Sequence, residues 1–351
     1  MKSISFAMVS LAISFSAAAV DKTPFNVREL ASLDRISSPT LSPNGQFALF
    51  AVRKADVANN KSKTSLWIEN LSARDAAPPV LFTDESMNVN SPSFSADGQT
   101  IYFLSSKSGS MQLWSQAVGS KTANQLSNYE MDVGSYNIAP NGQSVALSFE
   151  VFNDCADLAC SKKRLADKSA QKTTGMLFDK TFVRHWDTYS DGRRNQLFVA
   201  ALSNSKTGAP VKVSVGIDGD IPSKPFGDAS EYTWSPDSKS IVFSVRIAGK
   251  TEPWSTNFDL YQVAATGQTK PKNLTAANKA WDTQPVFSAD RKTLFYRAMK
   301  RAGYESDRFA LMSMDLTTSK TKEIAPNWDR SADGLMLSEN GREIYTVADN
   351  L

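Results

Sequence analysis

Ser42-Pro43-Asn44-Gly45, followed at once by the apolar run Phe47 to Val52, is the first copy of a phrase that recurs along the chain. The further copies are Ser95-Ala96-Asp97-Gly98, Ala139-Pro140-Asn141-Gly142, Ser235-Pro236-Asp237-Ser238, Ser288-Ala289-Asp290-Arg291 and Ser338-Glu339-Asn340-Gly341. Asn-Gly and Asp-Gly pairs suit tight hairpins, because both residues can adopt positive φ. The phrase therefore predicts a hairpin turn that leads into a strand.

The spacing of the phrase is typical of propeller blades. Counted from Pro43, successive copies lie 53, 44, 96, 53 and 50 residues apart, and four-stranded blades repeat every 40 to 50 residues or so. The step of 96 is about two units long, and it contains predicted strands at Phe178 to His185 and Asn195 to Leu202 on either side of an Asp-Gly turn. Six marked units and one unmarked unit predict an all-β propeller of about seven four-stranded blades.

The second strand of each later unit is visible as an apolar run after the phrase. These runs are Thr100 to Leu104, Ser144 to Phe149, Ser240 to Val245, Thr293 to Arg297 and Glu343 to Val347. The last unit, residues 330–351, offers only two strands, Gly334 to Leu337 and Ile344 to Val347. We therefore expect an incomplete last blade in a chain that is cut short, because closure of a propeller requires the last blade to pack on the first.

The N-terminus predicts export. Lys2 precedes the mostly apolar run Ile4 to Phe15, and Ala17 to Ala19 supply small residues for a signal peptidase. This pattern predicts a signal peptide at 1–19 with cleavage near Ala19, a lead-in at 20–36 and a propeller at 37–351. The alternative is a retained membrane anchor. No later stretch reaches 18 continuous apolar residues, so we expect no membrane span in the mature chain and a periplasmic or secreted location.

The composition and the motifs of the chain limit the classes of partner and cofactor that we expect. The chain has 39 basic and 36 acidic residues in 351, so its net charge provides no strong field toward nucleic acid. No Gly-rich phosphate loop, His-x-x-x-His or Cys-x-x-Cys spacing or dinucleotide fingerprint occurs. We predict no cofactor and no nucleic-acid partner.

The two cysteines, Cys155 and Cys160, lie in a polar, partly helical insert predicted at 152–175. An oxidising compartment favours a disulfide between them, and closure of so small a loop contributes about 2 kcal/mol. Metal binding is the alternative, but two thiols and one distant histidine do not complete a four-ligand zinc set. We predict a disulfide and no metal site.

Several longer phrases are more specific than the repeat. They are Asn153 to Cys160 (NDCADLAC), Phe182 to Gly192 (FVRHWDTYSDG), Asp282 to Ser288 (DTQPVFS) and Arg297 to Arg308 (RAMKRAGYESDR). Together they make the chain, from about residue 23 to 351, similar to the N-terminal propeller of exported bacterial dipeptidyl peptidases in the acylaminoacyl-peptidase branch of the prolyl oligopeptidase family. This resemblance implies a propeller that caps a C-terminal α/β-hydrolase domain, excludes folded proteins and shapes the site for short peptides.

The chemistry of such a serine peptidase requires a Gly-x-Ser-x-Gly elbow, an acid and a histidine in that order. The sequence contains no such elbow, and its single histidine is His185, in a predicted strand. We assign no catalytic residue and expect His185, Trp186 and Asp187 to shape a strand and its turn; the alternative is that Trp186 or Asp187 reaches the central cavity.

The function predicted is therefore that of the substrate-gating portion of an exported serine exopeptidase, inactive without the missing α/β-hydrolase domain that would be its partner. An autonomous periplasmic propeller that binds a protein or peptide as a scaffold is the alternative.

Tyr304, Glu305, Asp307 and Arg308 are the candidate substrate-binding residues. They follow a strand and a glycine, which places them on a loop. An aminopeptidase must hold the free ammonium group of its substrate, and a carboxylate at the rim of the propeller can do so. Glu305 is the first choice, Asp307 the second, and Arg308 would orient one of them. The alternative is an internal ion pair, Asp307 with Arg308 or Glu305 with Arg301, that fastens adjacent blades.

Overall fold

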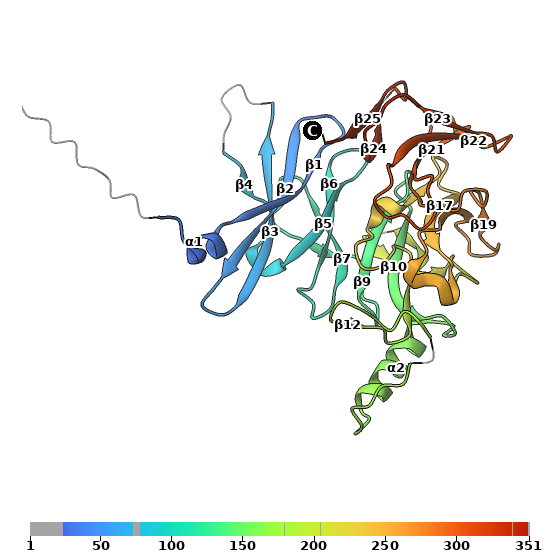
Figure 1. The fold of residues 1–351 in the computed structure, drawn as a ribbon. Coiled ribbons are helices and arrows are strands. Elements are labelled where there is room, and N and C mark those ends of the chain that lie inside the picture. The colour runs from blue at the N-terminus through green and yellow to red at the C-terminus, as the bar shows by residue number, and fades with distance from the viewer. Residues whose placement is uncertain (1–23, 73–77, 179, 204, 339, 350–351) are drawn as a thin grey trace, which may run out of the picture.

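The computed structural model describes residues 24–72, 78–178, 180–203, 205–338 and 340–349. Within them the chain folds into antiparallel sheets that follow one another in sequence order (Figure 1). Blade 1 is β1 (Arg35–Leu41), β2 (Phe47–Asp56), β3 (Lys61–Asn70) and β4 (Val80–Leu81), and blade 2 is β5 (Val89–Phe94), β6 (Thr100–Ser105), β7 (Gln112–Ala117) and β8 (Asn124–Gln125). The 3-10 helix η1 (Glu85–Met87) joins them.

Four further sheets complete the described propeller. Blade 3 is β9 (Val133–Ile138), β10 (Ser144–Phe152), β13 (Arg193–Ser203), β14 (Lys206–Thr207) and β15 (Val211–Lys212). Blade 4 is β16 (Tyr232–Trp234), β17 (Ser240–Arg246), β18 (Phe258–Ala264) and β19 (Lys272–Asn273). Blade 5 is β20 (Asp282–Phe287), β21 (Thr293–Ala298), β22 (Ala310–Asp315) and β23 (Thr321–Ile324), and blade 6 is β24 (Asp333–Leu337) and β25 (Ile344–Val347). The prediction of an all-β propeller with an incomplete last blade is thereby confirmed.

The repeated phrase has a local structural cause. The hydroxyl of Ser42 donates to Oδ1 of Asn44 over 2.7 Å and accepts the backbone N–H of Phe47 at 2.9 Å. The same serine-to-Asx bond recurs at Ser95, Ser235, Ser288 and Ser338. Gly45 adopts a φ of 68°, a conformation that favours glycine. The phrase is thus a turn that closes the first hairpin of each blade.

The separate unmarked unit is not found in the described part of the chain. The second strand predicted for this unit is β13, which pairs with the whole of β10, from Ser144 opposite Ala201 to Phe152 opposite Arg193. The long step arises because residues 153–192 are inserted between two strands of blade 3, so blade sheets number six among the described residues. Lengthening a surface connection costs little closure entropy, which is why one blade tolerates such an insert.

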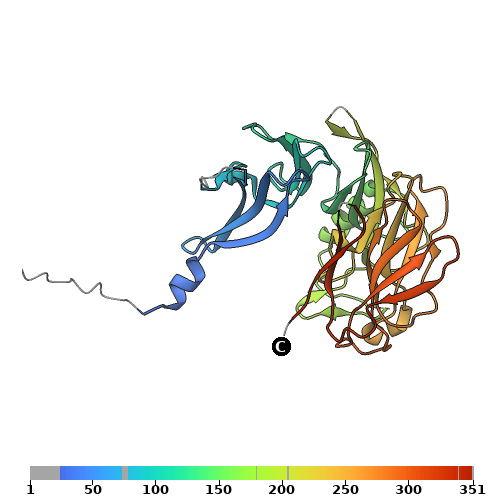
Figure 2. The ribbon, with the colours of Figure 1, turned by 90° about the horizontal axis from the view of Figure 1, so that it is seen from above.

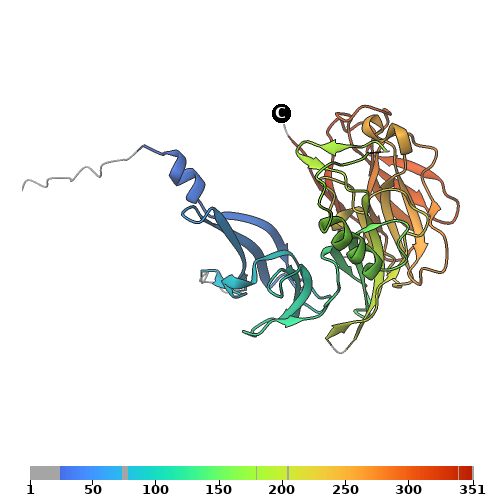
Figure 3. The ribbon, with the colours of Figure 1, turned by 90° about the horizontal axis from the view of Figure 1, so that it is seen from below.

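The apolar core lies in the seams between neighbouring blades. Leu49 and Leu66 of blade 1 pack with Ile101 and Phe103 of blade 2, and all four side chains are fully buried. Equivalent clusters join blades 2 and 3, 3 and 4, and 4 and 5. Figures 2 and 3 show the sheets as an open arc, with the blue first blade apart from the red last one. The seams therefore fix each blade mainly to its sequence neighbours.

The insert carries two local elements. Helix α2 (Leu158–Ser169) begins at the N-cap Asp157, whose carboxylate accepts the backbone N–H of Cys160 at 2.8 Å. Further along, β11 (Arg184–His185) and β12 (Thr188–Tyr189) form a two-stranded hairpin outside the blade sheets. Of the strand predicted at Phe178 to His185, the described residues form a strand only at Arg184–His185.

The N-terminal part that the structure describes consists of helix α1 (Val27–Ser32), which has no buried residue. The predicted signal peptide, 1–19, lies outside the described residues. Among the helices in the described ranges, none combines the length and hydropathy needed to cross a bilayer.

Cys155 and Cys160 form a disulfide at the start of α2. Replacing both cysteines by serine should lower the free energy of unfolding by about 2 kcal/mol, because the unfolded chain loses a small closed loop. Urea unfolding of the native protein with and without reductant measures the difference. Reductant should leave the doubly substituted variant unchanged, and identical midpoints for the oxidised and reduced native protein would contradict the expectation.

Candidate functional site

The candidate site lies at the end of the blades opposite the phrase turns. Each blade runs antiparallel, so the connection between its second and third strands and the connection to the next blade emerge at the same end. The insert of blade 3, the β17–β18 loop and the β21–β22 loop therefore meet there. They surround two adjoining cavities of about 660 and 520 Å³.

The two cavities share seven lining residues, so we treat them as one groove. Residues that line both are Phe182, His185, Ser223, Lys224, Pro225, Arg246 and Phe258. The first cavity lies against blade 3 and the β11–β12 hairpin, whereas the second extends to Trp281 and Phe309 of the blade 4 to blade 5 region. We call the whole feature the groove.

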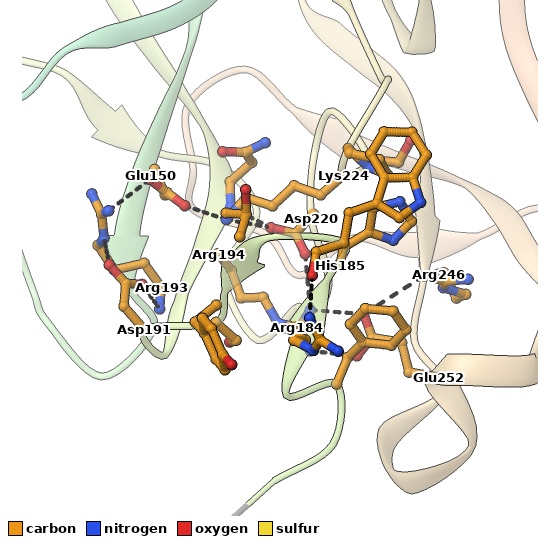
Figure 4. Close-up of a pocket in the computed structure, with 18 of the residues that line it drawn as sticks. Glu150, Arg184, His185, Asp191, Arg193, Arg194, Asp220, Lys224, Arg246 and Glu252 are labelled. Carbon is orange, nitrogen blue, oxygen red and sulfur yellow. Dashed lines mark hydrogen bonds and ion pairs between the residues drawn. The ribbon is translucent and has the colours of Figure 1, made fainter. Parts of the chain in front are cut away.

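Arg194 is the centre of an ion network in the first cavity (Figure 4). Its guanidinium contacts both carboxylate oxygens of Glu252, at 2.8 and 2.6 Å, and one oxygen of Asp220 at 2.8 Å. The bonds to Glu252, with the nearby charge of Asp220, raise the pKa of Arg194 above its ordinary value. Because Glu252 lies in the 3-10 helix η3 (Gly249–Trp254), the network ties blade 3 to the loop of blade 4.

Most of the other charged groups around the first cavity are also paired, although Arg184 donates to the backbone carbonyl of Trp186 instead. Arg193 bonds Asp191 at 2.7 Å and Glu150 at 2.9 Å. Lys224 contacts Glu150 as well, and reaches Asp220 at 3.6 Å. These pairs hold the walls of the cavity together, and so leave its ionic groups less free to bind a ligand.

Four aromatic rings stand over the shared wall, and we call Phe182, His185, Trp186 and Phe226 the aromatic hood. The ring of His185 lies 4.8 Å from Trp186 and 5.8 Å from Phe182 between centroids, and Trp186 lies 5.5 Å from Phe226. Trp186 and Phe226 are nonetheless 70% and 74% exposed. Nε2 of His185 is buried with no hydrogen-bond partner among the described residues. His185 lies in the short strand β11, and Trp186 lines the first cavity.

Glu305 lines the second cavity. Its neighbours there include Phe258, Trp281 and Phe309. Phe258 stacks on Trp281 with ring centroids 4.5 Å apart, and Trp281 meets Phe309 edge to face at 5.7 Å. Within the described ranges, no hydrogen bond or ion pair engages the carboxylate of Glu305. A free carboxylate in the wall of a cavity is suited to a cationic ligand.

The other three candidates are placed differently, and they do not line the groove. Asp307 accepts the backbone N–H groups of Lys300 and Arg301 at 2.8 and 2.7 Å, and so closes its own loop. Arg308 pairs with Glu323 at 2.6 Å. Tyr304 lies 4.1 Å under the guanidinium of Arg301. Of the four predicted residues, the structure leaves Glu305 as the one facing the groove.

The alternative ion pairs can also be examined. Among the described residues, Asp307 does not pair with Arg308, and Glu305 does not pair with Arg301. A different pair, Arg308 with Glu323, fastens the loop to β23 of the same blade.

Glu231 is a buried wall residue that sequence reasoning did not identify. It accepts the backbone N–H and the hydroxyl of Ser223, each at 2.7 Å, and burial raises its pKa. These bonds hold the segment from Ser223 to Phe226 at the shared wall. Its sequence context, an isolated glutamate before a strand, carried no signal for such a role.

No family model matches the chain. Curated relatives do: the chain is 30% identical over 352 residues to dipeptidyl-peptidase 5 of Porphyromonas gingivalis, covering 98% of this chain and 50% of that protein. It is 27% identical to the probable dipeptidyl-peptidase 5 of Arthroderma benhamiae, over 93% of this chain and 47% of that protein. The chain thus spans about half the length of these relatives.

Solved structures with the same fold include acylaminoacyl peptidase of Pyrococcus horikoshii, with a TM-score of 0.62, 14% identity, and coverage of 91% of this chain and 43% of that one. The β-propeller domain of the trilobed protease of Pyrococcus furiosus has a TM-score of 0.53, 13% identity, and coverage of 92% and 79%. At such identities these likenesses show the fold alone.

The solved structures define the fold as a β-propeller. The sequence relatives make the chain similar to about half of dipeptidyl-peptidase 5, which is consistent with the propeller portion of a peptidase of the prolyl oligopeptidase family.

Proposed function

We propose that the chain is the substrate-gating propeller of an exported serine exopeptidase of dipeptidyl-peptidase type, and that Glu305 binds the N-terminal ammonium group of a short peptide. The observation that carries the proposal is the unpaired carboxylate of Glu305 in the wall of the second cavity. The other acidic side chains in this wall serve local structure: Glu231 binds Ser223, and Asp228 accepts the N–H of Ser230 at 2.8 Å.

The surroundings suit a peptide end. An ammonium group donates three hydrogen bonds, and a charge-assisted bond to a carboxylate is about twice as strong as a neutral one. Arg246 lines the same cavity as Glu305, but its guanidinium already donates to the backbone carbonyl of Ser255 at 2.9 Å and lies 3.8 Å from the carboxylate of Glu252.

Hydrolysis is assigned to a different part of the enzyme. The sequence has one histidine and no Gly-x-Ser-x-Gly elbow, and His185 stands among aromatic rings, where no serine or cysteine nucleophile bonds it within the described residues. The proposed partner is an α/β-hydrolase domain that supplies the serine, acid and histidine. The purified chain should cleave no dipeptidyl chromogenic substrate; cleavage that a serine-directed inhibitor abolishes would contradict this.

Isothermal titration of the chain with alanyl-alanine amide tests the role of Glu305. Glu305→Gln should weaken binding about tenfold or more, because the amide keeps the shape of the side chain and loses its charge. N-acetylation of the peptide should weaken binding to the native chain by a similar factor and have little further effect on the variant. The matched control is Glu130→Gln, an exposed glutamate outside both cavities, which should bind as the native chain does. Equal affinities of native chain and Glu305→Gln would overturn the proposal.

A further inference from the structure

The aromatic hood is not explained by the packing of the blades. Trp186 lies at the turn of the β11–β12 hairpin and Phe226 on the connection from blade 3 to blade 4, so two separate segments bring the rings together. Both rings remain more than two thirds exposed, at 70% and 74%. Neighbouring exposed aromatic side chains beside a cavity indicate a contact surface for an apolar ligand group.

The hairpin is held so that the hood keeps its position. Arg184 donates to the backbone carbonyl of Trp186 at 2.8 Å, and the N–H of Ser190 donates to the carbonyl of Val183 at 2.9 Å. Trp186 adopts a φ of 49°, which is uncommon for a bulky residue and fixes the direction of its side chain at the turn. On the opposite side, the bonds from Ser223 to Glu231 anchor the segment that carries Phe226.

The hood and the free carboxylate border the same cavity. His185 and Phe226 line the second cavity together with Glu305, and Phe182 and His185 line both cavities. A ligand that satisfies both features needs a positive charge and a large apolar group a short distance apart. A peptide whose first residue is aromatic or long and aliphatic has this chemistry.

We propose that the aromatic hood is a specificity-determining subsite, which selects short peptides with an aromatic or large aliphatic N-terminal side chain. The inference takes its peptide orientation from the proposed role of Glu305. The side chain stacks on Trp186 and Phe226 while the ammonium group faces Glu305. The gain over a small side chain comes from removing the ligand ring from water, so phenylalanine should be preferred to alanine by about tenfold or more.

Isothermal titration of the full chain with phenylalanyl-alanine amide, alanyl-alanine amide and N-acetyl-phenylalanyl-alanine amide tests both proposals. Trp186→Ala and Phe226→Ala should each remove most of the preference for phenylalanyl-alanine amide over alanyl-alanine amide. The matched control is Trp254→Ala: Trp254 is 69% exposed, close to the 70% of Trp186, but lines neither cavity. This control should retain the preference. Circular dichroism should show native folding for all three variants, since each replaced side chain is exposed.

The outcomes separate the two proposals. Equal affinities for the phenylalanyl and alanyl peptides, with both weakened by acetylation, would overturn the hood and leave the role of Glu305 standing. A preference for phenylalanine that survives acetylation would overturn the role of Glu305 and support the hood. A preference lost equally in Trp186→Ala and Trp254→Ala would overturn the hood, and failure of all three peptides to bind at millimolar concentration would overturn both.

Discussion

Replacing Arg194 by methionine should lower the free energy of unfolding by about 3 to 5 kcal/mol, because two nearly buried carboxylates then lose their common partner. The side chains of Asp220 and Glu252 are only 9% and 10% exposed, and both bond the guanidinium at 2.8 Å or less. Removing one member of such a network leaves uncompensated charge in a poorly solvated place. Urea unfolding at neutral pH measures the loss.

The chain provides a matched control for this expectation. Arg164 also makes a two-pronged contact with a carboxylate, that of Asp154, with both bonds at 2.8 Å. These side chains are 42% and 71% exposed, so Arg164→Met should cost less than about 1 kcal/mol. Adding Glu252→Met to Arg194→Met should restore part of the lost stability, because an unpaired buried charge is removed. Equal losses for Arg164→Met and Arg194→Met would contradict the role given to burial.

Asp282→Asn should raise the free energy of unfolding above neutral pH. It should also remove a large part of the pH dependence of that free energy. Asp282 begins β20 and is fully buried between blades 4 and 5, where its backbone carbonyl accepts the hydroxyl of Ser244 at 2.7 Å. Asn278 donates to one carboxylate oxygen at 2.8 Å, and the other oxygen has no partner among the described residues. Burial raises the pKa of Asp282 from 3.8 to about 7, and the charge of Asp259 adds to the shift.

The direction of the pH effect follows from that raised pKa. The folded protein binds the proton more tightly than the unfolded chain, so the contribution of Asp282 to stability is fully present below about pH 4. It is lost as the pH rises through about 7, and the shift of about three units corresponds to about 4 kcal/mol. The stability gap between Asp282→Asn and the native protein should therefore widen from pH 4 to pH 7 and then level off, which urea unfolding across this range measures.

Asp97→Asn is the control for Asp282→Asn. Asp97 occupies the exposed turn phrase, where the hydroxyl of Ser95 lowers its pKa. The chain uses asparagine at the equivalent Asn44, Asn141 and Asn340. This substitution should change the free energy of unfolding only slightly. The pH dependence of that change should have the opposite sign to the one expected for Asp282→Asn. A gap between Asp282→Asn and the native protein that stays constant from pH 4 to pH 8 would rule out the proposed titration.

The sequence predicted much of the fold for a physical reason. In five of the six copies a serine hydroxyl bonds the Asx side chain, and in all six the residue after the Asx has a positive φ. Each copy of the phrase therefore carries its own turn, and the strand after it follows from its apolar run. The incomplete last blade was also predicted from local sequence, because the last unit has apolar runs for only two strands. The long step was misassigned because spacing along the chain cannot distinguish an extra blade from an insert within one; the pairing of β10 with β13 decides it.

The candidate site was predictable only in part. Glu305 was named from its place on a loop with a carboxylate, but nothing local distinguished it from Asp307, whose oxygen is taken up by the N–H groups of Lys300 and Arg301. The hood and the Arg194 network were not predicted, because their members come from different blades and inserts.

The sequence by itself therefore determined the turns and most of the blade strands, since these depend on short-range chemistry, and it indicated the likeness to dipeptidyl-peptidase 5. Only the tertiary structure decided which strands share a blade, which carboxylates are free, paired or buried, and which aromatic rings gather at the groove. Those properties depend on distance, burial and charge between residues far apart in the chain, as the contact of Arg194 with Glu252 and the pKa of Asp282 show.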